Sequence, residues 1–510
     1  MKNILKYNKW MLLLMVFIFT SCEKDFMDVN HDPSRTAEST VQLTFPAGVG
    51  SSAYVIGGYY QLLGGFWSQH WTQAVGAPQW RDIDSYNLQT SDFDVRQWGE
   101  LYSGALNDYQ YVRNLAKSKQ NWSYYLMATA MQAYTYQVIA DLYDKIPYTE
   151  ALQGDNGNLT PKYDNGSVVY DGLIAMLNEA LSHDYKNFQS STNPTATAVE
   201  PGTDDIIFAG DMDKWESFVN TLKLKIYLRQ CYARPTVASA GIQAMYTANA
   251  SFLNVDAKIA IFASQQNKRN PAYETFIDRL AGNVSMSNTI FSFLINDTIT
   301  PDPRLPKLIA KNKLAVPAYK CLAQGDYFNT SFPTGANIAN LSTPVLTGVD
   351  PVYFFSAAES YFLQAEAIER YSLTGSAKTM YENGINASFS RLGVSGASAF
   401  YAVGKPYEYP STGTFENKLE KIIVQKWAAM TNNQGIESFF EQNRTHYPKI
   451  SPVPSSDTTY VRGQFTISVN SSTGNLFPKR LLFTESERRR NPNTPALESI
   501  NKRVWWDVKP

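Results

Sequence analysis

The chain has 510 residues and a formal net charge of −1 at pH 7, with 14% aromatic residues led by 32 tyrosines. This length allows a large hydrophobic core, and the balanced charge excludes the strongly basic surface typical of nucleic-acid-binding proteins. Three cysteines in so long a chain exclude a disulfide framework, and Cys231, near the end of an apolar segment, is interpreted as a buried thiol.

The first 21 residues have the pattern of a bacterial export signal. Three lysines precede an apolar run over residues 10–19, and two small residues stand before Cys22. The run has the length of a signal-peptide core and is shorter than the roughly 20 apolar residues of a membrane span. We therefore predict that residues 1–21 are a lipoprotein signal peptide and that Cys22 carries the lipid. The alternative is an ordinary secretory signal followed by a chance cysteine.

Residues 22–40 are polar and rich in turn-forming residues, which predicts a lipidated N-terminal tether. Two or three acyl chains on Cys22 would anchor the protein stably, because each buried methylene contributes about 0.8 kcal/mol. The remaining residues, 41–510, are predicted to form a single domain.

Apolar residues at helical spacing predict helices along much of this domain. The predicted segments are 101–118, 122–143, 168–181, 214–232, 356–371 and 377–392, and a core-facing stripe covers 419–430. Residues 122–143 are apolar on nearly every face, which indicates a buried helix. Ser356 and Glu359 have the spacing of a capping box at the start of the fifth segment.

Long segments rich in Gly, Ser, Thr, Asn and Pro separate the helices, at 184–210, 325–350, 394–416 and 449–476. Loops of this length are uncommon in an ordered protein unless they serve its function. The sequence therefore predicts a mainly α fold, in which paired helices form a frame that carries long irregular loop insertions and few strands.

Several motifs occur in a fixed order along the chain. They are Asn-x-Asp-Pro at 30–33, Trp-x-x-x-Tyr-x-x-x-Leu-Asn at 98–107, Ile-Pro-Tyr-x-Glu-Ala at 146–151, Trp-x-x-Phe-x-Asn-x-Leu at 215–222, and Glu-x-x-Phe-Leu-x-Ala-Glu-Ala at 359–367. A Pro-x-Arg segment follows at 478–485, where Phe483-Thr484 replaces the usual Tyr-Pro, and Trp-Trp-Asp stands near the C-terminus at 505–507. In this order the motifs resemble those of the SusD/RagB nutrient-binding outer-membrane lipoproteins of Bacteroidetes, in the SusD-like branch of unassigned ligand.

The resemblance implies helix pairs of tetratricopeptide type and a non-enzymatic role that needs no cofactor. Members of this family bind a glycan or an oligopeptide at the cell exterior. They deliver it to a partner SusC-like TonB-dependent transporter in the outer membrane, to which they stay close through a lipid anchor. The resemblance implies no nucleic-acid partner.

The best ligand-binding candidates are Trp80, Arg81 and Tyr86, which follow Gly76 and Pro78 in a loop-like context. An aromatic face can pack on the C–H face of a sugar or on a peptide side chain, and a guanidinium can donate to hydroxyls or carbonyls. Because we expect Trp80 on a loop, its replacement by alanine should weaken binding with little loss of stability. The nearby Trp67 and Trp71 have helical spacing and are expected to pack inward.

Two further aromatic groups are candidates. Tyr401 and Tyr407 lie with Phe400 and Tyr409 on a loop rich in Gly and Pro, and Tyr327 with Phe328 forms a weaker third group.

Catalytic and metal-binding motifs are not evident. The four histidines are scattered, and no His-Glu-x-x-His or Gly-x-Ser-x-Gly motif is present. The acids at 204–205 and at 211 and 213 lack EF-hand spacing and are interpreted as solvated loop residues rather than as calcium ligands. The alternative function is a surface glycoside hydrolase on an α/α frame, which would need two opposed carboxylates in a cleft.

Overall fold

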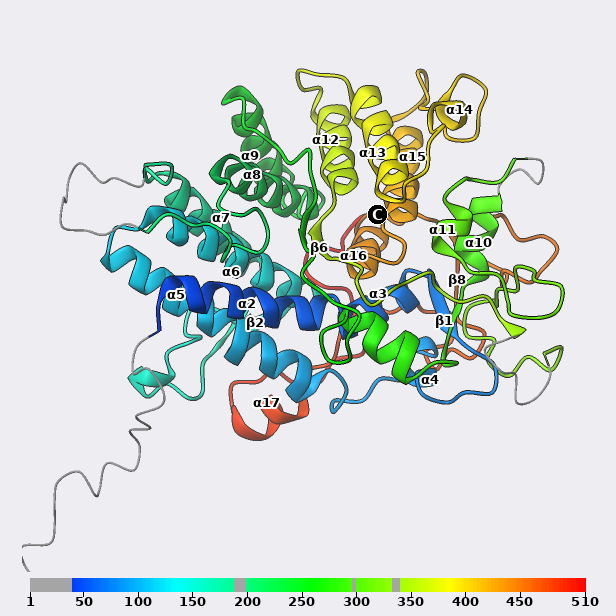
Figure 1. The fold of residues 1–510 in the computed structure, drawn as a ribbon, viewed down its shortest axis with the longest axis horizontal. Coiled ribbons are helices and arrows are strands. Elements are labelled where there is room, and N and C mark those ends of the chain that lie inside the picture. Colours follow the sequence, from blue (N-terminus) through cyan, green and yellow to red (C-terminus); the bar gives the residue numbers. More distant parts are fainter. Residues whose placement is uncertain (1–38, 188–198, 296–299, 333–339) are drawn as a thin grey trace, which may run out of the picture.

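The computed structural model describes residues 39–187, 199–295, 300–332 and 340–510. Cys22, the predicted signal peptide and nearly all of the predicted tether lie outside these ranges. The described chain is mainly helical, with long irregular connections between the helices (Figure 1), which confirms the predicted fold class. No described helix is both long enough and apolar enough to cross a membrane.

The N-terminal half contains a layer of helices packed around one buried helix. Its helices are α2 (Val41–Ile56), α3 (Tyr59–Trp67), α4 (Arg81–Asp84), η2 (Asp94–Leu106), α5 (Asn107–Ser118), α6 (Trp122–Tyr143), η3 (Gly154–Asn156) and α7 (Gly166–Leu181). Helix α6 has the predicted bounds and is buried along nearly its whole length, with α5 and α7 packed beside it. The predicted helix 101–118 begins earlier, because the π-helix η2 continues directly into α5.

The remaining helices lie between residues 212 and 490. They are α8 (Met212–Arg229), α9 (Pro235–Thr247), η4 (Tyr273–Arg279), α10 (Asn288–Ile295), α11 (Leu305–Leu308), α12 (Ala357–Tyr371), α13 (Ala377–Arg391), α14 (Ser398–Tyr401), α15 (Phe415–Ala429), α16 (Gly435–Thr445) and α17 (Glu485–Arg490). Helices α12 and α13 pack closely as the predicted hairpin, and α15 packs against both.

Half of the predicted capping box at the start of α12 forms. The Ser356 hydroxyl accepts a hydrogen bond from the backbone N–H of Glu359 at 3.2 Å. The Glu359 carboxylate does not complete the box, because it bonds the side chains of Lys225 and Gln434 in the interior.

The strands are short and join segments that are distant in sequence. The antiparallel pairs are β1 (Trp71–Gln73) with β5 (Val284–Met286), β2 (Lys145–Pro147) with β3 (Tyr163–Asn165), and β4 (Ala257–Ile259) with β6 (Val352–Phe355); β7 (Ile450–Ser451) and β8 (Phe465–Thr466) pair in parallel. The β1–β5 pair fixes the start of the loop that carries Trp80.

Charged side chains are buried where α6, α8, α12, α15 and α16 meet. The carboxylates are Asp141, Glu359, Glu366, Glu437 and Glu441, and the bases are Lys225, Arg229, Lys426 and Arg444, each at most 4% exposed. Ion pairs connect these residues across the helices. Since a buried charge is costly unless it is paired, this network requires the helices to meet in one register.

Candidate functional site

The single helical turn α4 places Trp80 and Arg81 on different sides. Trp80 stands just before the turn, and its backbone N–H donates to the Gln73 side chain at 2.7 Å. Its ring packs edge-to-face against Tyr59 and Phe276, with centroid distances of 6.3 and 5.5 Å. Trp80 is therefore part of the core, at 8% exposed, and not the freely exposed loop residue that the sequence predicts.

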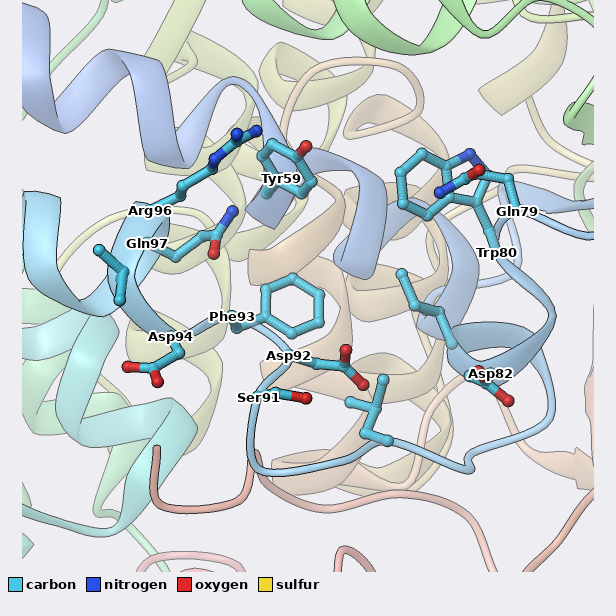
Figure 2. A pocket seen from close by; sticks show the side chains of 13 residues that line it. Tyr59, Gln79, Trp80, Asp82, Ser91, Asp92, Phe93, Asp94, Arg96 and Gln97 are labelled. Atoms are coloured by element: carbon cyan, nitrogen blue, oxygen red, sulfur yellow. The ribbon is translucent and has the colours of Figure 1, made fainter. Parts of the chain in front are cut away.

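A cavity of about 420 Å³ opens beside Trp80 (Figure 2). The rings of Tyr59, Trp80 and Phe93 form its apolar walls, and Asp92 and Gln97 are among its polar groups. This volume lies within the range of small-ligand sites, as does a lining that mixes aromatic rings with a few polar groups.

Two features of the cavity resemble those of functional sites. Phe93 has a φ of 57°, in the left-handed region that non-glycine residues rarely adopt, and it directly precedes the π-helix η2. Such strain and π-type helical turns both concentrate at functional sites. The indole N–H of Trp80 is buried and has no acceptor among the described residues.

The acids of the cavity can accept hydrogen bonds from hydroxyl groups. Burial raises the pKa of Asp92, and the nearby Asp82 carboxylate raises it further, while the backbone N–H of Gln89 opposes both. One Asp92 oxygen accepts that N–H at 2.8 Å.

Arg81, from the first group of candidate residues, contacts both rings of the third group, Tyr327 and Phe328. Its guanidinium carbon lies 5.2 Å from the Tyr327 ring centre and 4.7 Å from that of Phe328. Phe328 is 61% exposed, so a flat aromatic ring with guanidinium donors beside it is presented to solvent. This is the stacking-plus-donor combination expected of a glycan contact.

Asp84 fixes the geometry of this surface, and sequence reasoning missed its role. One of its oxygens accepts hydrogen bonds from the Thr72 hydroxyl at 2.8 Å and from the Gln73 N–H at 2.7 Å. The other accepts from the Gln324 side chain, three residues before Tyr327. Burial raises the pKa of Asp84 to about 6, although these donors oppose the shift. Asp84 lies in a polar segment, and nothing in that segment indicates that its carboxylate connects two loops through hydrogen bonds.

The structure does not bring Tyr86 to the surface. Its side chain is 2% exposed, its ring packs edge-on against Phe477, and its hydroxyl accepts the Ser468 backbone N–H at 3.3 Å. Tyr86 therefore supports the loops behind the cavity and is not placed to contact a ligand. Trp67 and Trp71 are fully buried, which confirms that they pack inward.

The second aromatic group belongs to a separate core cluster, built on α12, α13 and α15. Tyr407 is 2% exposed, its ring stacks on Phe293 and Phe400, and its hydroxyl donates to Asp302 at 2.7 Å. Tyr407, which we expected on a binding loop, thus belongs to the core. Tyr401 is partly exposed, and its hydroxyl bonds the Asn386 amide at 3.2 Å. Helix α14, which ends at Tyr401, lies far from α4 (Figure 1).

Two of the four acids considered for calcium, Asp205 and Asp211, have structural roles, whereas Asp213 is exposed as predicted. Asp205 is buried and accepts hydrogen bonds from the Trp215 indole N–H at 2.7 Å and the Gly210 N–H at 2.9 Å, so it is not a solvated loop residue. Asp211 caps α8. The described part of the chain contains no cluster of three or more His, Cys, Asp or Glu residues that could hold a metal ion.

Cys231 is buried as predicted, and both it and Cys321 are free thiols.

Comparison with known proteins gives a family and a fold. Residues 60–465 match the SusD-like family described as "Starch-binding associating with outer membrane". No curated protein sequence matches the chain.

Solved structures share the fold over nearly the whole chain. A SusD homolog from Bacteroides uniformis has a TM-score of 0.74 at 21% identity, covering 92% of this chain and 100% of its own. A chitin-binding SusD homolog from Flavobacterium johnsoniae has a TM-score of 0.74 at 23% identity, covering 92% and 99%. A SusD homolog from Bacteroides thetaiotaomicron has a TM-score of 0.70 at 22% identity, covering 93% and 100%.

These matches decide between the two functions that the sequence leaves open. The family consists of non-catalytic binding proteins associated with the outer membrane, so the glycoside hydrolase alternative is not supported. The chain belongs to the SusD-like family of outer-membrane-associated binding proteins.

Proposed function

We propose that this chain is a lipid-anchored protein of the outer cell surface that captures a glycan and delivers it to a partner TonB-dependent transporter. The family is described as starch-binding, and one structural relative is described as chitin-binding. Both ligands are glycans, and this favours a glycan over the oligopeptide that remains the second candidate ligand.

The observation that carries the proposal is the pairing of an aromatic-walled cavity with an exposed aromatic ring. Trp80 faces the cavity, and the guanidinium carbon of its neighbour Arg81 lies 4.7 Å from the centre of the largely exposed Phe328 ring. A sugar chain offers apolar C–H faces to the rings, while its hydroxyls can bond the Arg81 guanidinium and the Asp92 carboxylate.

Calorimetric titration of the mature, unlipidated protein tests the proposal. A maltooligosaccharide, a chitooligosaccharide and a mixed oligopeptide are the probes, and release of shorter products is followed in the same samples. We expect one of the two glycans to bind without being cleaved. Binding of the oligopeptide alone would replace glycan by peptide as the ligand class, and turnover of any probe would contradict a binding role.

Delivery to a transporter requires a partner and an anchor. We expect the lipidated protein, isolated from outer membranes in mild detergent, to co-purify with a TonB-dependent barrel. Isolation of the protein alone, under conditions that preserve other outer-membrane complexes, would count against this partner.

A further inference from the structure

We propose a second binding site, separate from the α4 cavity, for a sugar that carries a carboxylate. It lies in a groove of about 760 Å³ between the β4–β6 pair and helices α12 and α13. In Figure 1 these helices are at the top of the molecule, away from α4. The site thus lies outside the surface assigned above.

The groove contains an arginine, Arg391, that forms no ion pair with a carboxylate among the described residues. The Asp256 carboxylate acts on it only beyond ion-pair distance, and the Tyr353 side chain is a hydrogen-bond partner. The Arg391 guanidinium donates from Nη2 to the backbone oxygens of Ala429 at 3.1 Å and Thr431 at 3.5 Å. Its Nε is buried and has no acceptor in the described part of the chain. Because a guanidinium in a desolvated position is costly without an anion, this arrangement favours an anionic ligand.

The other charges of the groove leave it net positive. Lys258 and Arg391 lie around one ring, with Nζ 5.5 Å and the guanidinium carbon 5.8 Å from the centre of Tyr353. Asp256 is the single acid of the lining. Its two oxygens are already engaged, one by the Ala357 N–H at 2.9 Å and the other by Lys258 at 3.2 Å. Two bases and one acid give the lining a charge of +1.

Side-chain amides give the groove its affinity for hydroxyls. Asn383 and Asn386 lie on α13, and Asn254 faces them from the segment before β4. Asn386 bonds the hydroxyl of Tyr401, which places that predicted site residue next to this groove. Side-chain amides both donate and accept, as sugar hydroxyls require. Amides with a net positive charge favour an acidic sugar over a neutral sugar or a simple anion.

A short oligogalacturonate and its fully methyl-esterified form are the test probes, because they differ in charge and share the sugar backbone. In calorimetric titrations we expect the acid to bind and the ester to bind about tenfold more weakly or worse, since a charge-assisted hydrogen bond is lost at the carboxylate. Equal binding of the two forms, or no binding of the acid, would overturn the proposal.

Variants then locate the binding. Arg391→Gln and Lys258→Gln should each weaken oligogalacturonate binding by about tenfold, and Lys258 is a surface residue whose loss leaves the core intact. Lys378→Gln is the matched control, because Lys378 is also on α13, is paired with Glu382 and lies outside the groove. If Lys258→Gln and Lys378→Gln bind oligogalacturonate with equal affinity, the binding site is not in this groove. Phe328→Ala should leave acid binding unchanged, which separates this test from that of the α4 surface.

Discussion

Arg444 on α16 and Glu366 on α12 form a two-pronged ion pair in the interior. Nη1 lies 2.7 Å from Oε1 and Nη2 lies 2.6 Å from Oε2, and the two residues are 78 positions apart in sequence. Burial alone would raise the pKa of Glu366, but the Arg444 and Arg370 guanidiniums outweigh it and hold that pKa below its usual range. The pair therefore remains charged and fixes the position of α12 against α16.

Replacing Arg444 by leucine should strongly destabilise the protein. The substitution leaves Glu366 and Glu441 buried with fewer partners, and breaking a buried pair on one side typically costs about 3–5 kcal/mol. Denaturant unfolding followed by circular dichroism measures the loss.

Arg489→Leu is the control for this prediction. Arg489 pairs with Glu485 on α17, but its side chain is 76% exposed, and exposed pairs contribute at most about 1 kcal/mol. If Arg444→Leu and Arg489→Leu lowered the free energy of unfolding by similar amounts, burial would not be what makes the Arg444 ion pairs important for stability.

Helices are predictable from this sequence where the apolar pattern is local. Helix α6 has the predicted bounds, and α12 begins at the expected Ser356 cap, because packing periodicity and capping are properties of neighbouring residues. The charge network is not predictable in this way. The spacing of Glu359 indicates a local cap, whereas its partner Lys225 is 134 residues away.

In the candidate site, too, features set by neighbouring residues are predictable from the sequence, and contacts between distant residues are not. Trp80 and Arg81 stand out in the sequence because they are adjacent, but the contact of Arg81 with Phe328 depends on how two distant loops fold together. Tyr86 and Tyr407, which the sequence suggests as ligand contacts, are both buried. Loop composition alone does not reveal which side of a loop faces the core. Tertiary packing decides that question.

Phe328→Ala should weaken glycan binding while stability stays within about 0.5 kcal/mol, because the ring is largely exposed. Loss of one aromatic contact of about 1 kcal/mol corresponds to an about fivefold weaker affinity. Calorimetry and thermal unfolding of the same sample separate the two effects.

Two further variants complete this experiment. Leu159→Ala is the control, since Leu159 is also highly exposed but neither lines the cavity nor contacts Arg81; the affinity of this variant should equal that of the wild type. Trp80→Ala should cost about 3–5 kcal/mol of stability, because its ring is packed in the core. An unchanged affinity in Phe328→Ala would remove that ring from the binding surface.

Cys22→Ala should release the protein from the membrane. The thiol is the attachment point of the predicted lipid, and two or three acyl chains are what would anchor the protein stably. Cell fractionation with immunoblotting measures the change, and Cys231→Ala is the control because Cys231 is a buried thiol. A Cys22→Ala protein that stays in the membrane fraction would contradict lipid anchoring at this residue.

Asp84 should give the stability of the protein a distinct pH dependence. Burial raises its pKa in the folded protein from 3.8 to about 6, so between these values the folded state binds more protons at this group than the unfolded state. The contribution of Asp84 to the free energy of unfolding therefore falls as pH rises from about 4 to about 6, by about 3 kcal/mol, and is constant above that range. Asp84→Asn cannot titrate at this position, so the free energy of the wild type relative to this variant should decline across the same window. Urea unfolding at several pH values checks this, and a difference that does not change with pH would show that Asp84 titrates normally.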